Sequence, residues 1–227
     1  PSLGQISISD QGNNIYLIVT EDNHIPHQIY NVVIQNITDL VGNPIDTAHN
    51  TVSFLGGSTG SILPITSMTG EVAGNYFGCS ISSSGDVNGD GYEDIVVGVP
   101  KNDENGPDTG KVYIYFGGEE MDNVPDITMT GEVVSDGFGY CVSSAGDVNG
   151  DGYDDMIIAA PYNDDNSNNA GKTYIYFGGE AVDNIADITI NGENEWDLFG
   201  SSVSSAGDVN GDGYDDVIVS AHLNNTN

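Results

Sequence analysis

Short apolar runs, each bounded by turn-forming residues, are the clearest pattern along this chain. Three of them, at residues 95–99, 156–160 and 217–221, each follow an acidic stretch. They are apolar at nearly every position instead of at alternate positions, which is typical of strands that are buried on both faces. We therefore expect sheets that pack face to face.

Further runs extend each unit to four strands. Residues 112–116 and 173–177 are β-branched and aromatic, and each run ends at a Gly-Gly pair. Residues 126–132 and 187–193 predict one more strand after that turn, and a Ser-rich stretch precedes each acidic segment. Four strands per unit predict the blade of a β-propeller.

The acidic stretch is one phrase written three times, Asp-Val-Asn-Gly-Asp-Gly-Tyr-(Glu/Asp)-Asp. It occupies residues 86–94, 147–155 and 208–216, so successive copies start at a constant interval. Phe77, Phe138 and Phe199, each followed by glycine, recur at the same interval. A constant period of this kind is the signature of a repeat architecture.

Each phrase carries side-chain oxygens at its first, third, fifth and ninth positions, with glycines between them. Ca²⁺ binds several carboxylate, amide and carbonyl oxygens at about 2.3–2.6 Å, and glycine lets a short backbone fold around one ion. The carbonyl of the tyrosine at the seventh position is the expected fifth ligand. We expect about three Ca²⁺ ions, one per loop, and loose loops when calcium is removed. The predicted ligands are Asp86, Asn88, Asp90, Tyr92 and Asp94 in the first loop, Asp147, Asn149, Asp151, Tyr153 and Asp155 in the second, and Asp208, Asn210, Asp212, Tyr214 and Asp216 in the third.

Two other structures share part of this phrase. EF-hand and dockerin loops also begin Asp-x-Asn-x-Asp-Gly, but they need a bidentate acid at the twelfth position and flanking helices. The twelfth residues here are Val97, Ile158 and Val219, inside predicted strands. Simple Asn-Gly and Asp-Gly turns would explain one copy, but not the same four oxygens in three copies.

Composition narrows the class of partner. The chain has 35 acidic residues against three lysines, which gives a formal net charge of −32. Nucleic acid and anionic membranes both require clustered basic residues, so neither is an expected partner. Membrane insertion is not expected either, because no apolar run approaches the length of about 20 residues that a transmembrane helix needs. The acidic surplus suits a solvated surface in salty or calcium-rich surroundings, or a face that attracts cations or a basic partner.

The Phe-Gly openings, the Gly-Asp-Val-Asn-Gly-Asp-Gly-Tyr loops and the Gly-Val-Pro or Ala-Ala-Pro sequences after them together resemble the FG-GAP repeats of the integrin α-subunit propeller. The resemblance covers residues 62–227. It implies a seven-bladed propeller with calcium in the hairpin between the first two strands of a blade. The third unit departs from the pattern, because it ends Ser220-Ala221-His222 without a proline. We expect an incomplete propeller, about three four-stranded blades of seven, whose remaining blades belong to a larger protein.

Residues 1–57 lack the acidic phrase and alternate more clearly between apolar and polar positions. Residues 30–45, followed by a closing strand at 51–54, resemble the C-terminal half of a bacterial immunoglobulin-like domain. We therefore predict a partial immunoglobulin-like β-sandwich over 1–57 and propeller blades over 58–227, with units that open near Phe77, Phe138 and Phe199. An alternative boundary exists, because Phe54-Leu-Gly-Gly precedes Tyr115-Phe-Gly-Gly by one repeat length and is thus in phase with the repeat.

Nothing in the sequence predicts a catalytic site. The histidines, His24, His27, His49 and His222, are scattered, and their spacing to serine or cysteine indicates no catalytic arrangement. We therefore expect this chain not to be an enzyme. The Asn-rich and Asp-rich segments after Pro100 and Pro161 predict exposed loops, which serve either as plain connectors or as recognition surfaces.

The expected function is a calcium-binding, non-catalytic extracellular module for cell adhesion or for matrix and surface assembly. Its partner would be a protein or glycan that the sequence does not identify. An alternative is an accessory propeller of a secreted hydrolase, phospholipase D-like or polysaccharide-active, because FG-GAP repeats also resemble modules of such enzymes. A third is a purely structural, calcium-loaded spacer. A secreted or cell-surface location is expected, because weak sites of this kind suit millimolar calcium.

Overall fold

The computed structural model describes residues 51–58, 61–119 and 121–224. In this part of the chain every regular element is a β-strand. None of the described residues belongs to a helix long and apolar enough to cross a membrane. The all-β prediction is confirmed.

Two four-stranded antiparallel sheets form the centre of the described chain. Their strand orders, β3-β4-β5-β6 and β10-β9-β8-β7, show that each strand pairs with its neighbours in sequence. Such a four-stranded meander is a propeller blade, which confirms the predicted incomplete propeller. The strands of the first blade are β3 (Ser80–Gly85), β4 (Asp94–Val99), β5 (Lys111–Tyr115) and β6 (Ile127–Thr130), and those of the second are β7 (Cys141–Gly146), β8 (Asp155–Ala160), β9 (Lys172–Tyr176) and β10 (Ile188–Asn191).

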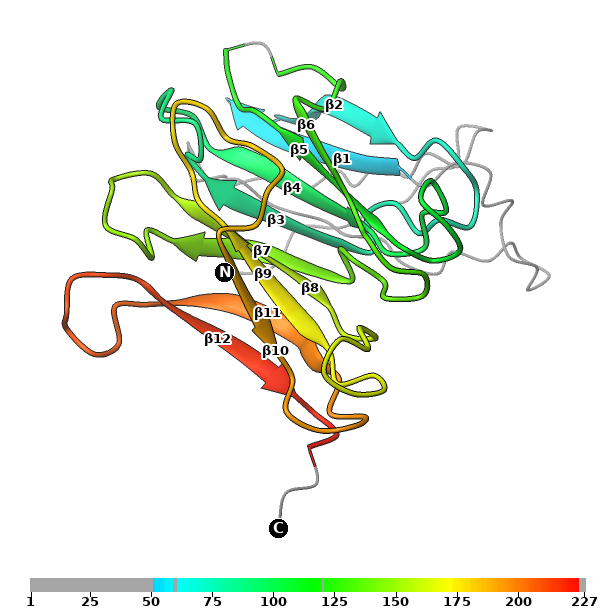
Figure 1. Cartoon of the computed structure of the whole chain (residues 1–227). Coiled ribbons are helices and arrows are strands. Elements are labelled where there is room, and N and C mark those ends of the chain that lie inside the picture. Colours follow the sequence, from blue (N-terminus) through cyan, green and yellow to red (C-terminus); the bar gives the residue numbers. More distant parts are fainter. Residues whose placement is uncertain (1–50, 59–60, 120, 225–227) are drawn as a thin grey trace, which may run out of the picture.

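A two-stranded sheet lies on each side of these blades. On the C-terminal side, β11 (Phe199–Gly207) pairs with β12 (Asp216–Ala221) and repeats the β3–β4 hairpin. On the N-terminal side, β1 (Thr51–Ser58) pairs antiparallel with β2 (Ser61–Thr69). The sheets follow one another in chain order, from β1–β2 at the top of Figure 1 to β11–β12 at the bottom.

The β1–β2 hairpin is in phase with the last two strands of a blade. Met68 of β2 is buried in one cluster with Phe77, as Met129 of β6 is buried in another with Phe138. The predicted domain boundary at residue 57 falls inside β1. The immunoglobulin-like assignment rests mainly on residues 1–50, which lie outside the described residues, and it stays a prediction.

The spaces between the sheets are filled by alternate residues of each blade's second strand. Val97 of β4 packs in the cluster that contains Phe77, whereas its neighbour Val96 packs with Ile158 of β8. Ile157 of β8 points the other way, into the cluster shared with β11. Because successive residues of a strand face opposite sides, these runs must be apolar throughout. The predicted burial on both faces is therefore confirmed for β4 and β8, whereas β12, the run at 217–221, is only partly buried, because no further strand among the described residues covers its outer face.

Each Phe-Gly pair packs one unit onto the unit before it. The backbone N–H of Phe138 donates to the carbonyl of Thr109 at 3.1 Å, and its ring meets Tyr174 edge-on with the centroids 5.3 Å apart. A Cβ on Gly139 would lie 2.6 Å from the carbonyl oxygen of Lys111. Real Cβ contacts are not that short, so the position requires glycine. The aromatic ring and the glycine thus together allow adjacent blades to approach closely.

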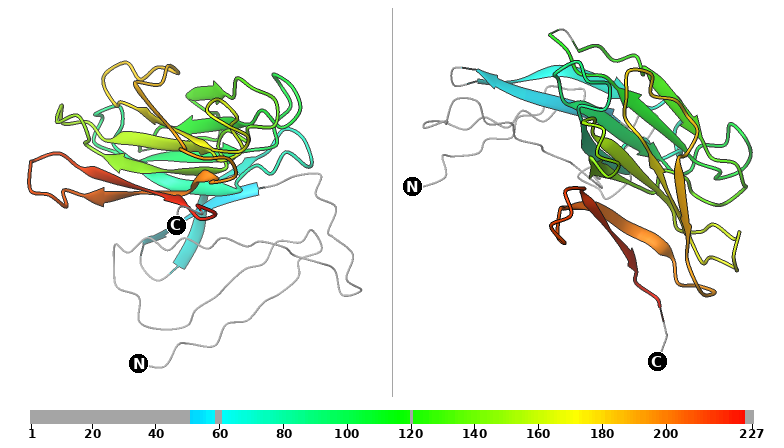
Figure 2. Two further views of the ribbon diagram at one scale, coloured as in Figure 1. Left: turned by 60° about the horizontal axis from the view of Figure 1, so that its bottom comes forward. Right: turned by 60° about the vertical axis from the view of Figure 1, so that its left-hand side comes forward.

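The repeat places the acidic loops at one edge of the stack. They connect β3 to β4, β7 to β8, and β11 to β12, and they project toward the left of Figure 1. The connections from β4 to β5 and from β8 to β9 leave the opposite edge. Figure 2 shows from two further directions that the sheets fan out in succession. The fold therefore brings three loops of nearly the same sequence into a row.

Candidate functional site

Each acidic loop joins the first two strands of its unit. Asp86 follows the end of β3, and Asp94 is the first residue of β4. Asp94 pairs with Gly85 across the hairpin, where the register shifts. The predicted ligands at the first and ninth positions therefore stand at the base of the same hairpin, and the other three lie in the loop between them.

Asp86 organises the first loop. Its Oδ1 accepts hydrogen bonds from the backbone N–H groups of Gly89 at 2.8 Å and Asp90 at 3.0 Å, and its Oδ2 accepts one from Gly91 at 2.8 Å. Both glycines have positive φ, +77° and +90°, which side chains with a Cβ rarely adopt. The phrase therefore folds on itself because its first carboxylate caps three backbone amides.

The third, fifth and seventh positions continue this network. Asn88 Oδ1 accepts from the N–H of Asp90 at 2.8 Å, and the Asn88 amide donates to Asp90 Oδ2 at 3.0 Å. Asp90 Oδ1 accepts from the N–H of Tyr92 at 2.9 Å. Asn88 is partly buried, whereas Asp90 and Tyr92 are exposed. The oxygens of these positions thus lie on a short, internally bonded turn.

Asp94 is fully buried at the base of the loop. Its Oδ2 accepts from the N–H of Val87 at 2.9 Å and its Oδ1 from the N–H of Gly117 at 2.8 Å. Burial raises the pKa of Asp94 to about 6, the nearby charges of Asp90 and Asp86 add to this rise, and the two N–H groups oppose it. The first, fifth and ninth carboxylates therefore act on one another electrostatically.

The second loop repeats the first in detail. Asp147 caps the N–H groups at positions 150, 151 and 152. Asp155 is buried and bonds to the N–H groups of Val148 and Gly178. Burial, with added repulsion from Asp151 and Asp147, raises the pKa of Asp155 to about 6. In this loop Asn149 bonds to Asp151 and Tyr153 donates its N–H to Asp151, as their counterparts do in the first loop.

The third loop keeps the capping scaffold, but its Asp216 is only partly buried, and one hydrogen bond differs. Asp208 caps the N–H groups at 211, 212 and 213, and these bonds, chiefly that of Gly213, lower the pKa of Asp208. Asp216 accepts from the N–H of Val209 at 2.9 Å. The amide of Asn210 donates to Asp216, at 3.3 Å, instead of to Asp212. Tyr214 donates its N–H to Asp212, as in the other loops.

The loops carry the donor set of a hard cation, although their acidic side chains do not converge on one point. Among the described residues, no three acidic, histidine or cysteine side chains converge closely enough to surround an ion. The donors nevertheless suit calcium, since each loop offers carboxylate, amide and carbonyl oxygens within one short phrase. The ion pairs of the described chain, Lys111–Glu104 and Lys172–Asp165, lie outside the loops. Among the described residues, no ion pair therefore involves a loop carboxylate.

Sequence reasoning gave no role to the acid at the eighth position. In the structure, Asp154 and Asp215 each reach the loop of the preceding unit, where their carboxylates accept the N–H of Asp86 and of Asp147. The signal was present, because the eighth residue is acidic in all three copies. Its contact depends on how adjacent blades pack, which the phrase alone does not specify.

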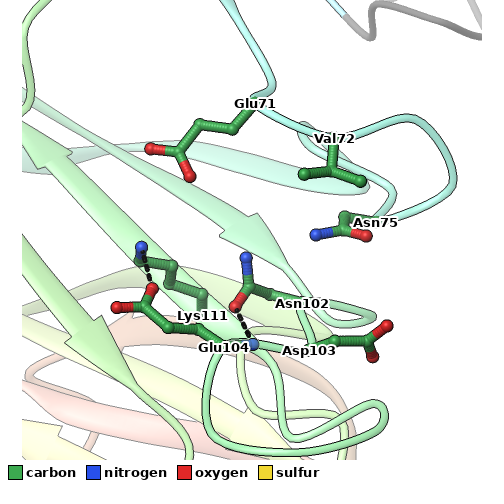
Figure 3. A pocket seen from close by; sticks show the side chains of 7 residues that line it. All are labelled: Glu71, Val72, Asn75, Asn102, Asp103, Glu104 and Lys111. Atoms are coloured by element: carbon green, nitrogen blue, oxygen red, sulfur yellow. Dashed lines mark hydrogen bonds and ion pairs between the residues drawn. The ribbon is translucent and has the colours of Figure 1, made fainter.

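A pocket of about 410 Å³ lies at the opposite edge, between the β2–β3 and β4–β5 connections. Figure 3 shows Lys111 directed at Glu104, with Nζ and Oε2 2.5 Å apart. Lys111 Nζ also lies 5.0 Å from the centroid of the Tyr113 ring. The lining contains no serine, cysteine or histidine. Its residues are Glu71, Val72, Asn75, Asn102, Asp103, Glu104 and Lys111.

The comparison with known families agrees with these units. The FG-GAP repeat family matches residues 80–115, 138–176 and 199–227. The matched segments begin in or beside β3, β7 and β11, the first strand of each unit. Each match contains one acidic loop.

Several integrin alpha subunits are similar to this chain. It is 32% identical to integrin alpha-5 of Xenopus laevis over 163 residues, which cover 67% of this chain and 15% of that protein. It is 34% identical to integrin alpha-PS2 of Drosophila melanogaster over 177 residues, covering 70% and 12%. With human integrin alpha-6 the identity is 34% over 161 residues, covering 70% and 14%. The match thus spans less than a sixth of each relative. The chain thus contains FG-GAP repeats, and these are similar to the repeats of integrin alpha subunits.

Proposed function

We propose that each acidic loop binds one Ca²⁺ ion, about three in all, through the oxygens at its first, third, fifth, seventh and ninth positions. The observation that carries this proposal is the threefold recurrence of one donor set on one hydrogen-bonded scaffold. The first-position aspartate caps the same three amides in every loop. A simple turn requires neither two further acids nor the ninth-position carboxylate, which is buried in the first two loops and partly buried in the third.

The ion would supply positive charge where the fold gathers like charges. Asp86, Asp90 and Asp94 belong to one short loop, and Asp94 is withdrawn from water. Three clustered carboxylates repel one another, and a divalent ion reverses this cost. Because Asp86 follows β3 and Asp94 begins β4, their joint ligation would fasten the two strands together. Calcium would thereby stiffen each blade.

We further propose that the stiffened blades serve as a non-catalytic, extracellular module for adhesion or surface assembly. The similarity to integrin alpha subunits supports this class of function. The edge opposite the acidic loops carries exposed side chains, Tyr76 and Trp196 among them. An unidentified protein or glycan would bind there, and further blades would complete the propeller. A matrix-protein and glycan array, probed with the calcium-loaded chain, tests this; an array without any bound partner would contradict it.

Calcium titration with a matched pair of variants tests the metal proposal. Isothermal titration should show about three sites, and saturating calcium should raise the melting temperature, because a ligand at 100 times its Kd stabilises by about 2.7 kcal/mol per site. Replacing Asp90, Asp151 and Asp212 by alanine should remove both effects. Replacing Glu119, Glu180 and Glu195 by alanine changes the net charge equally and should remove neither. An unaltered chain that neither binds calcium nor melts higher would overturn the proposal.

A further inference from the structure

Neighbouring acidic loops are joined by a reciprocal pair of hydrogen bonds. Asp154 Oδ2 accepts from the backbone N–H of Asp86 at 2.9 Å, and the N–H of Asp154 donates to the Asp86 carbonyl at 3.3 Å. The next pair of loops repeats this arrangement. Asp215 Oδ2 accepts from the N–H of Asp147 at 3.0 Å, and the N–H of Asp215 donates to the Asp147 carbonyl at 3.0 Å. In each pair, the later loop is thus hydrogen-bonded to the first predicted ligand of the loop before it.

Close packing reinforces these bonds. A Cβ on Gly89 would lie 2.4 Å from Cε1 of Tyr153, and one on Gly150 would lie 2.5 Å from Cε1 of Tyr214. A Cβ on Gly85 would meet the Asp154 carboxylate at 2.2 Å. Contacts that short do not occur, so the glycines leave room for the next loop. Adjacent loops are therefore in direct contact at these glycines.

The first loop provides an internal comparison. Its eighth residue, Glu93, is exposed, and its carboxylate accepts from the hydroxyl of Ser83 in the same hairpin at 2.6 Å. One repeat earlier, residues 25–33 do not contain the acidic phrase. The eighth-position acid thus contacts a neighbouring loop in the two units that follow an acidic loop. In the first unit it bonds within its own hairpin.

We propose that Asp154 and Asp215 couple calcium binding between neighbouring loops; this rests on the proposed calcium function. Asp154 stands between Tyr153 and Asp155, two predicted ligands of the second loop, while its side chain holds Asp86, a predicted ligand of the first. Ordering residues 153–155 around a cation fixes Asp154, and Asp154 then fixes Asp86. By linkage, binding at the first loop favours binding at the second by the same factor. Asp154 is a positioning residue and not a ligand.

Electrostatics opposes this coupling, but it leaves the second loop attractive to a cation. Asp86, Asp90 and Asp94 carry three negative charges when ionised, so a loop that holds one divalent ion still has a net charge of about −1. Asp154 adds a further negative charge between the two loops. A second cation is therefore still attracted, but less strongly than it would be to an empty neighbour, so the gain from ordering has to exceed this difference. Salt screens the opposing term at these exposed loops. Positive cooperativity in the usual range of about 5- to 150-fold is expected.

The test is a cycle of variants in the full chain, titrated with Ca²⁺ and followed at the amide NMR signals of Gly89 and Gly91 in the first loop. Asp212→Ala, present throughout, silences the third loop. Adding Asp151→Ala silences the second loop and should weaken calcium binding at the first loop at least about 5-fold. In an Asp154→Ala background this loss should disappear. Asp154→Asn should restore it, because an amide oxygen can still accept the N–H of Asp86.

Two further measurements separate coupling from damage to the fold. Glu93→Ala alters the same phrase position without touching another loop, and it should leave the coupling unchanged. In metal-free protein the Asp86 amide should exchange faster with solvent in Asp154→Ala, but not in Glu93→Ala. The coupling would be contradicted if Asp151→Ala left the calcium affinity of the first loop unchanged, or if it lowered that affinity equally with and without Asp154. Either result would leave the proposed calcium function standing. An unaltered chain without any calcium response would overturn the calcium function itself.

Discussion

Asp136 is a buried carboxylate whose charged form is disfavoured by its surroundings. It is buried, and the Asn163 amide donates to its Oδ2 at 2.5 Å. Burial raises the pKa of Asp136 to about 6, and the hydrogen bond from Asn163 opposes this rise. The nearby charges of Asp165 and Asp164 raise the pKa further. The equivalent residue in the preceding unit is Asn75, which is uncharged. An amide therefore suits this position at least as well as a carboxylate.

The first prediction concerns Asp136→Asn. Because the pKa of Asp136 rises from 3.8 to about 6 on folding, the folded state binds this proton more tightly. Protonated Asp136 therefore contributes to the unfolding free energy fully below about pH 4, and this contribution is lost as the pH rises through 6. Asparagine cannot ionise, so the substituted protein does not suffer this loss, and its amide oxygen still accepts a hydrogen bond from Asn163. We expect about 2 kcal/mol more stability at pH 7, but little change at pH 4.

Urea unfolding of both proteins across this pH range, in metal-free buffer, provides the measurement. The other acidic groups are common to both proteins, so the difference between the two curves isolates Asp136. A difference that stays constant from pH 4 to pH 7 would show that burial does not shift its titration.

At the scale of the elements, the strand runs could be predicted because their signal is local. The apolar stretches at 95–99 and 156–160 became β4 and β8, and the Gly-Gly pairs ended β5 and β9. The fourth strand was predicted too long, as 126–132 instead of Ile127–Thr130. Asp126 instead caps the previous turn, where its Oδ2 accepts the N–H of Phe116 at 2.7 Å. That contact is set by register, which the run itself does not encode.

Within the loops, the sequence indicated which oxygens could serve as ligands, but not how the loops meet. Gly89 was explained as a turn residue, and its φ of +77° agrees with that. Its second role, leaving room for Tyr153, depends on how closely the two blades approach. The same holds for Asp154, which lies 68 residues from its partner Asp86. Contacts between repeats require the packed structure.

The second prediction compares Gly89→Ala with Gly91→Ala. Both residues have positive φ, so each substitution should cost about 1–2 kcal/mol of backbone strain. At Gly91 nothing lies within 4 Å of the new methyl group, whereas at Gly89 the methyl would clash with the Tyr153 ring. Gly89→Ala should therefore destabilise the metal-free protein by about 1–3 kcal/mol more than Gly91→Ala.

Chemical denaturation measures both losses, and adding Tyr153→Ala supplies the control. Removal of the ring should bring the cost of Gly89→Ala down to that of Gly91→Ala. If the two glycine substitutions already cost the same with Tyr153 in place, the loops do not press on each other as the structure indicates.

At the scale of the molecule, the residues that face the next unit are buried only where that unit is present. Val96 in the first unit and Ile157 in the second are fully buried, whereas the equivalent Ile218 in the third is 62% exposed. Val87 is likewise buried, but its third-unit equivalent Val209 is 71% exposed. Among the described residues, the outer face of β11–β12 is thus a blade face without a covering blade. Its natural occupant in a propeller is the following blade.

The third prediction is that this chain associates in solution through the β11–β12 face. Exposed apolar residues on a sheet favour burial against a second surface, although a net charge of −32 opposes close approach. Salt screens that repulsion, since the Debye length falls from about 10 Å at 0.1 M to about 3 Å at 1 M. Association should therefore strengthen with sodium chloride, and sedimentation velocity over a concentration series should show it.

Ile218→Thr and Val124→Thr form a matched pair for this test, because both side chains are 62% exposed. Ile218 belongs to the blade face, while Val124 lies in the connection between β5 and β6. Ile218→Thr should weaken association several-fold at high salt, and Val124→Thr should leave it unchanged, because only the first removes apolar surface from the contact. Equal effects of the two substitutions would place the contact elsewhere, and a monomer at every salt concentration would show that charge repulsion outweighs the open face.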